Sequence, residues 1–123
     1  MSDGEQVKGQ VAEARRIASH YRLSGITALV DFNDIQISGR TKDIMKADLP
    51  GLWKVDGWSV TECDGHDPRA LYKALAEARS SERPTVVICH TVMGKGVSFM
   101  EGVPDYHGKA ASGGLYLQAM AEL

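Results

Sequence analysis

The chain of 123 residues is long enough for one small domain, and its 43% hydrophobic content allows a modest core. Its 14 basic and 16 acidic residues give a net charge of −2, so we expect no basic face for binding nucleic acid. No segment is long and apolar enough to span a bilayer, and the first residues are too polar for a signal peptide. We therefore expect a cytoplasmic protein with neither a nucleic-acid nor a membrane partner.

The hydrophobic pattern predicts helices that alternate with short strands. Apolar residues recur at steps of three or four positions from about residue 5 to residue 21, which predicts a first helix with one apolar face. Three short runs rich in Val, Ile and Thr predict strands at residues 26–32, 59–63 and 85–91. The last run is nearly continuously apolar, as expected for a strand buried on both faces of a parallel sheet. This order predicts an α/β fold built from parallel βαβ units.

Two later helices have predicted starting points. Asp67 and Pro68 fit the N-cap and the first turn of a helix whose apolar residues again recur at helical spacing. Ser112 fits the N-cap of a final helix over about residues 115–123. In the first of these helices, Leu71, Leu75 and Ala78 form the expected apolar stripe.

The two cysteines and two tryptophans are expected to be structural. Cys63 and Cys89 fall in predicted buried strands and lack Cys-x-x-Cys spacing, which favours reduced core thiols over a disulfide or a metal site. Trp53 and Trp58 flank a predicted short helix and the start of a strand, so we expect both to pack in the core.

The most informative spacing separates Asp3 from Asn33, 30 positions later, with one helix and one strand between them. A helix, a turn and a strand would return Asn33 to the sheet edge where Asp3 lies. A carboxylate and an amide oxygen, completed by a backbone carbonyl, phosphate oxygens and water, suit Mg²⁺ or Ca²⁺ shared with a diphosphate. Two simpler interpretations remain: Asp3 as an ordinary helix N-cap, and Asn33 as a turn residue after a strand.

Five segments, taken in order, resemble parts of one enzyme family. Ser2-Asp3-Gly4-Glu5 is similar to the start of the Gly-Asp-Gly-Glu motif of thiamine-diphosphate enzymes, with Asn33 as the later residue of that motif. The remaining segments are similar to the diphosphate-binding domain of transketolases: residues 31–39, 56–58, 64–67 and 90–101, the last followed by 106–108. The resemblance covers nearly the whole chain. It implies a fragment of a three-layer α/β/α sandwich with a mostly parallel sheet.

The resemblance also implies a set of site residues. Asp3 and Asn33 are expected to be side-chain ligands of Mg²⁺ or Ca²⁺, and Ile35 is expected to give its backbone carbonyl to the same ion. Gly4 is expected to contact the diphosphate of thiamine diphosphate. His107 is expected to reach both the cofactor diphosphate and the substrate channel, as a cofactor-binding and catalytic residue; the alternative is a surface histidine in a flexible loop.

The activity implied by the resemblance is transfer of a two-carbon ketol unit between sugar phosphates. Transketolases take the acidic residue that activates the cofactor from a separate pyrimidine-binding domain, usually of a partner subunit. We therefore expect a partner chain, a homo- or hetero-oligomer, and no turnover by the isolated chain.

Two departures from the family pattern shape the interpretation. The chain begins inside the motif, without the strand that ordinarily precedes it, and Ser2 replaces the first glycine. Residues 1–123 are therefore expected to be the carboxyl-side part of the domain, as a truncated product or a split subunit. The alternatives are a non-catalytic α/β interaction module, and part of another thiamine-diphosphate enzyme such as a deoxyxylulose-phosphate synthase or a dehydrogenase alpha subunit.

Overall fold

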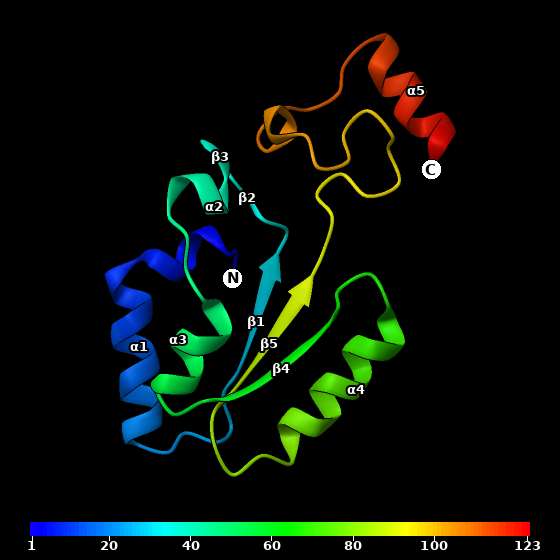
Figure 1. The fold of residues 1–123 in the computed structure, drawn as a ribbon. Coiled ribbons are helices and arrows are strands. Elements are labelled where there is room, and N and C mark those ends of the chain that lie inside the picture. Colours follow the sequence, from blue (N-terminus) through cyan, green and yellow to red (C-terminus); the bar gives the residue numbers. More distant parts are fainter.

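The computed structural model describes residues 1–123 and contains a three-stranded parallel sheet (Figure 1). Strand β5 (Thr85–His90) lies in the centre, between β1 (Thr27–Phe32) and β4 (Ser59–Asp64). All three strands run in the same direction and in full register, so their carboxyl ends meet at one edge of the sheet. Ligands bind at this edge in open parallel sheets.

Helices cover both faces of the sheet, as Figure 1 shows. One face carries α1 (Gly9–His20) and α3 (Leu49–Val55), and the opposite face carries α4 (Pro68–Arg79). The remaining elements lie beyond the carboxyl ends of the strands or at the chain start: the 3₁₀ turns Gly4–Val7 and Pro104–Tyr106, the hairpin β2 (Ile35–Gln36) and β3 (Gly39–Arg40), and the helices α2 (Thr41–Ile44) and α5 (Gly114–Glu122).

Two apolar clusters form because successive strand residues point to opposite faces. The larger cluster joins the sheet to α1 and α3, and its buried members are Ala18, Val30, Leu49, Trp53, Trp58, Val86 and Ile88. The smaller cluster joins the sheet to α4, and its buried members are Ala74, Val87 and Cys89. The predicted three-layer α/β/α arrangement is therefore confirmed, as is the expected packing role of both tryptophans.

The strands differ in burial according to their positions in the sheet. The first five residues of β5 are buried, which confirms the prediction of a strand covered on both faces. No residue of β4 is fully buried, because β4 is an edge strand paired only with β5. Cys63 is therefore half-buried rather than buried, whereas Cys89 is buried, and both are free thiols as predicted.

The predicted helix over residues 5–21 is interrupted, and this part of the prediction is wrong. Lys8 adopts an extended conformation (φ −75°, ψ 138°) between the 3₁₀ turn Gly4–Val7 and α1. The cause is tertiary: the buried Gln6 amide donates to Ser2 O and accepts from Trp53 Nε1 at 3.1 Å. These two bonds fix Gln6 and the 3₁₀ turn that contains it, so the chain changes direction at Lys8 before α1 begins.

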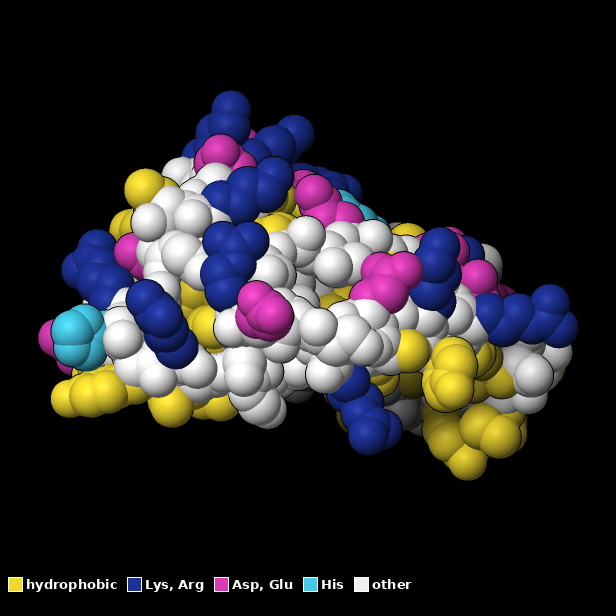
Figure 2. Space-filling view, turned by 90° about the horizontal axis from the view of Figure 1, so that it is seen from below, with side chains coloured by type: hydrophobic (Ala, Val, Ile, Leu, Met, Phe, Trp, Pro, Cys, Tyr) yellow, Lys and Arg dark blue, Asp and Glu magenta, His cyan; other side chains and the backbone are white.

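The final helix also starts differently from the prediction. Its N-cap is Gly113, with φ +57°, and no side chain caps the helix, so Ser112 is not the cap. In α5 only Ala119 is buried. Four of its large apolar side chains are exposed, namely Leu115, Tyr116, Leu117 and Met120, and so is that of Leu123, which follows the helix. Figure 2 shows hydrophobic side chains gathered at the end of the molecule formed by α5 and at the end formed by α1. Neither α5 nor any other helix has the length and apolar character needed to cross a bilayer.

A buried ion pair ties α1 to the end of α3. Arg15, whose side chain is 4% exposed, donates from Nε to Asp56 Oδ2 at 2.8 Å, and Arg16 donates to the other oxygen at 3.3 Å. The Arg15 guanidinium carbon also lies 5.2 Å from the ring centroid of Trp53. Burial raises the pKa of Asp56, but the hydrogen bonds from both arginines outweigh it and hold that pKa below its usual value.

Replacing this carboxylate should destabilise the fold. Asp56→Ala leaves the Arg15 charge buried without its partner, and we expect a loss of about 3 kcal/mol in the free energy of unfolding at pH 7. The contribution of Asp56 is present above the usual pKa of about 3.9 and is lost as the pH falls through the lower pKa of the folded state. Urea denaturation measures both effects. The exposed Asp43→Ala is the control, with an expected change within about 0.5 kcal/mol; equal effects of the two substitutions would contradict this account.

Candidate functional site

The first three residues lie beside the carboxyl end of β1. Asp31 N donates to Met1 O at 2.8 Å, and Asp3 N donates to Asp31 O at 3.0 Å. Ser2 forms a parallel bridge with Asp31. Asp3 is therefore held next to the turn that begins at Asn33, which is the juxtaposition that the 30-residue spacing predicts.

The Asp3 carboxylate is almost completely buried, with 1% of the residue exposed. Oδ1 accepts from Gly4 N at 2.7 Å, and Oδ2 accepts from Thr41 Oγ1 at 3.1 Å. Burial raises the pKa of Asp3, the hydrogen bonds from Thr41, Gly4 and the backbone of Asp34 oppose the rise, and the charge of Asp31 adds to it. Asp3 is thus an N-cap, as the simpler interpretation holds. Its hydrogen bonds do not fully offset the cost of burying the charged carboxylate.

Asn33 directly follows β1 and organises the next turn. Its Oδ1 accepts from Ile35 N at 3.0 Å, and its Nδ2 donates to Asp31 Oδ2 at 3.4 Å. The turn continues through Asp34, which has a left-handed φ of +59°. Asn33 is therefore a turn residue whose amide oxygen still has one free lone pair. Ile35 starts β2 with its side chain buried.

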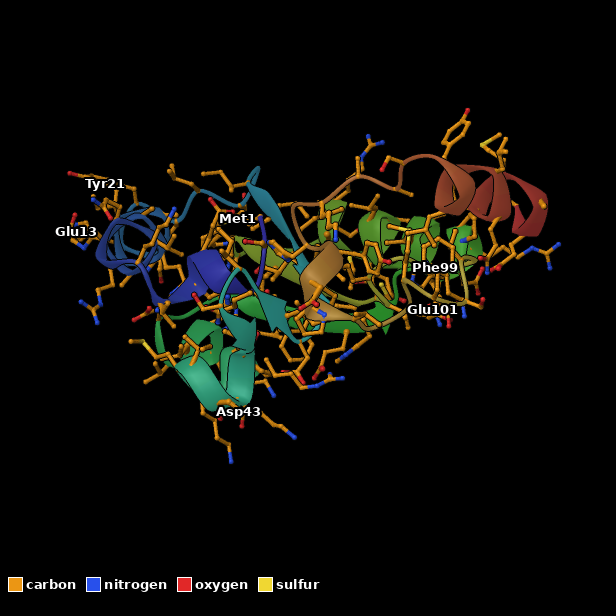
Figure 3. The ribbon with its side chains drawn as sticks, turned by 90° about the horizontal axis from the view of Figure 1, so that it is seen from above. Met1, Glu13, Tyr21, Asp43, Phe99 and Glu101 are labelled. Carbon is orange, nitrogen blue, oxygen red and sulfur yellow. The ribbon has the colours of Figure 1, made fainter.

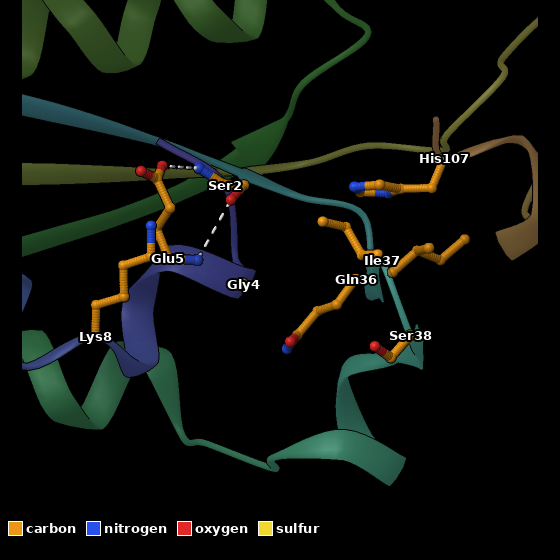
Figure 4. A pocket seen from close by; sticks show the side chains of 9 residues that line it. Ser2, Gly4, Glu5, Lys8, Gln36, Ile37, Ser38 and His107 are labelled. Carbon is orange, nitrogen blue, oxygen red and sulfur yellow. Dashed lines mark hydrogen bonds between the residues drawn. The ribbon is translucent and has the colours of Figure 1, made fainter. Parts of the chain in front are cut away.

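Gly4 and His107 both line a pocket of about 320 Å³ (Figure 4). His107 comes from the loop after the 3₁₀ turn Pro104–Tyr106 and is exposed. The lining residues are Ser2, Gly4, Glu5, Lys8, Ile35, Gln36, Ile37, Ser38 and His107. Three predicted site residues, Gly4, Ile35 and His107, therefore share one cavity. Asp3 and Asn33 do not line it; they lie close to lining residues in the chain.

A second pocket of about 520 Å³ adjoins the first. It shares Ile37, Ser38 and His107 with the first pocket, and it is also lined by Asp105 and Gly108. Gly94, Lys95 and Gly96 line neither cavity, and the Lys95 ammonium lies 3.7 Å from Glu101 Oε1. Glu101 and Phe99 lie toward α5, well away from Met1 (Figure 3).

The donor atoms at the end of β1 suit a hard cation better than a soft one. The chain contains no cluster of three His, Cys, Asp or Glu side chains that could hold a metal without further ligands. The available donors are the buried Asp3 carboxylate, the amide oxygen of Asn33 and nearby backbone carbonyls, all of them oxygens. Such a mixed oxygen set requires completion by ligand oxygens, as Mg²⁺ commonly receives from phosphates.

Three residues of this region are not identified by sequence reasoning. Thr41 is buried at the start of α2 and holds Asp3, although it lies 38 positions away. Lys8 and Gln36 line the pocket. Gln36 lies inside a segment that resembles the family, but the pattern assigns it no role. No sequence pattern around Thr41 indicates its role, because only the tertiary fold brings Asp3 next to it.

The family follows from comparison with known proteins. Residues 1–115 match the family described as transketolase, thiamine diphosphate binding domain. The chain belongs to the transketolase family. This confirms the resemblance carried by the five sequence segments.

Individual relatives agree with the family. The chain is 33% identical over 125 residues to an apulose-4-phosphate transketolase subunit of Phocaeicola vulgatus, and 34% identical over 125 residues to the 6-deoxy-6-sulfo-D-fructose transketolase subunit SqwG of a Clostridium species. Each alignment includes all of this chain, which spans 44% and 46% of those two proteins. The crystal structure of transketolase from Campylobacter jejuni matches with a TM-score of 0.92 and 26% identity, over 98% of this chain and 19% of that one.

The buried carboxylate gives a prediction about stability. Asp3→Asn keeps an N-cap side chain but removes a charge whose burial is unfavourable at any pH above the raised pKa. We expect its melting temperature at pH 7, in metal-free buffer, to equal or exceed that of the wild type. Asp3→Ala removes the cap and should cost about 1 kcal/mol. Thermal unfolding followed by circular dichroism measures both; a lower melting temperature for Asp3→Asn than for Asp3→Ala would contradict this description.

Proposed function

We propose that this chain binds the diphosphate of thiamine diphosphate through a divalent metal, Mg²⁺ or Ca²⁺, as part of a split transketolase. The observation that carries the proposal is the buried Asp3 carboxylate, held beside the Asn33 turn at the carboxyl end of β1 and next to a pocket that also contains His107. An anionic oxygen in that buried position is unfavourable by itself and favourable beside a cation.

Each residue has a proposed role. Asp3 and Asn33 offer side-chain oxygens to the metal, and Ile35 offers its backbone carbonyl. Gly4 lies at the pocket wall and would contact the diphosphate through its backbone. His107 holds or donates a proton at the imidazole, facing both the diphosphate and the adjoining pocket. When bound, thiamine diphosphate supplies the electron sink for transfer of a two-carbon ketol unit between sugar phosphates.

A partner chain is part of the proposal. The two relatives named above are themselves subunits of transketolases, and their names give two different sugars, apulose 4-phosphate and 6-deoxy-6-sulfo-D-fructose. We propose a sugar phosphate as the substrate class for this chain, and a partner that supplies the pyrimidine-binding domain with its acidic residue. Without that residue, the isolated chain should show no turnover.

Exposed apolar surface supports association with another chain. An apolar pocket of about 300 Å³ lies between α1, the start of β1 and the two tryptophans, and Arg15 lines it with its buried Nη1 atom lacking any hydrogen-bond partner. The apolar side chains on α5 form a second exposed surface. These surfaces equally favour a second candidate function, a non-catalytic interaction module, which requires no metal site.

Variants at the metal-binding turn distinguish the two functions. We expect Asn33→Ala to weaken Mg²⁺-dependent binding of thiamine diphosphate at least about tenfold, because a lost ligand leaves the metal shell incomplete. His107→Ala should weaken binding and leave its dependence on Mg²⁺ intact. Calorimetric titration measures both, and His20→Ala, on the exposed surface of α1, is the matched control.

The possible results separate clearly. Unchanged affinity in Asn33→Ala would remove Asn33 from the metal site. Absence of binding even in the wild type would reject the cofactor-binding proposal and favour the interaction module.

A further inference from the structure

Gln36 has an amide group that the protein leaves unpaired. The residue ends β2, and its Nε2 atom is buried without any hydrogen-bond partner. A buried amide N–H group that makes no hydrogen bond is unfavourable, so such groups in folded proteins usually have a partner. Gln36 lines the same pocket as Gly4, Ile35 and His107, and in Figure 4 its side chain extends toward the Gly4 side of the pocket, away from His107.

The contact between Gln36 and Gly4 fixes where the amide lies. A Cβ atom built on Gly4 would lie 3.2 Å from Cγ and 3.4 Å from Cδ of Gln36. The first distance is tighter than ordinary van der Waals contact, so a side chain at position 4 would require Gln36 to shift by a few tenths of an ångström. Because Gly4 has no side chain, Gln36 can extend along the pocket wall.

The polar neighbours in the pocket do not satisfy this amide. Glu5 Oε2 accepts from Ser2 N at 2.9 Å, and Ser2 Oγ accepts from Glu5 N at 3.3 Å, so these two residues pair with each other. Lys8, the cationic residue on the pocket wall, can donate but not accept. Ser38 and His107, the other polar residues of the lining, form no hydrogen bond with the amide either, so the protein leaves this donor without an acceptor.

We propose that Gln36 is a further diphosphate-binding residue: its amide, buried and unpaired in the structure, turns toward the pocket when the ligand binds, and its Nε2–H group then donates to a phosphate oxygen. This inference rests on the proposed function, since it assumes that the pocket takes the diphosphate. A phosphate oxygen is the fitting acceptor because hydrogen bonds to an anionic oxygen are stronger than those between neutral groups. A neutral amide adds this bond without adding charge to a pocket that already contains Lys8 and His107.

Binding measurements on Gln36 variants test the inference. Gln36→Met keeps a similar length but has no donor, and we expect it to weaken Mg²⁺-dependent binding of thiamine diphosphate about 10- to 100-fold. Inorganic pyrophosphate with Mg²⁺ should show the same loss. The melting temperature of Gln36→Met should equal or exceed that of the wild type, because the substitution removes a buried unpaired amide. Gln118→Met, on α5 and outside the pocket, is the matched control.

Each result decides one question. Wild-type binding together with equal binding by Gln36→Met overturns the role of Gln36 and leaves the proposed function intact. A loss for thiamine diphosphate but not for pyrophosphate places Gln36 against another part of the cofactor and overturns its assignment to the diphosphate. No binding of either ligand by the wild type overturns the proposed function and this inference together. If Gln36→Met does not fold, Gln36→Glu replaces it, with a larger expected loss.

Discussion

The structure depends on one backbone pairing at the end of β1. The two hydrogen bonds between Asp31 and residues Met1 and Asp3 place the Asp3 carboxylate against the following turn and remove it from water. Hydrogen bonds from Thr41 and Gly4 only partly offset this burial, so the pKa of Asp3 is raised. The pairing that extends the edge of the sheet thus also creates a position where a cation would be favourable.

The site combines residues of the packed layers with a residue from a loop. Gln6 binds Trp53, Trp53 packs edge-on against Trp58 with ring centroids 4.6 Å apart, and Arg15 pairs with Asp56, so α1, α3 and the first turn form one unit. Gly4 and the turn at Asn33 belong to that unit. His107 belongs to the long connection after β5, which lies outside the layers. Under the proposed function, Gly4 would hold the diphosphate from the packed layers, and His107 would approach it from a loop.

Much of this arrangement can be predicted from the sequence, because it follows from local patterns. The apolar run in β5, the Asp67-Pro68 helix start and the spacing between Asp3 and Asn33 each depend on periodicity or topology. The break at Lys8, the glycine cap of α5 and the exposure of Cys63 cannot be predicted this way, because they depend on a distant tryptophan, a left-handed backbone and an edge position in the sheet. The roles of Thr41 and Gln36 cannot be predicted either, because they depend on Asp3 and Gly4, which are distant in the sequence.

The central claim is that the buried carboxylate at the end of β1 serves a metal-bound diphosphate. Calorimetric titration of the wild-type chain with thiamine diphosphate, in Mg²⁺ and again with excess chelator, tests it most directly. The account predicts saturable binding with Mg²⁺ and its loss with the chelator. Binding that is equally strong in both conditions, or absent from both, would contradict the account.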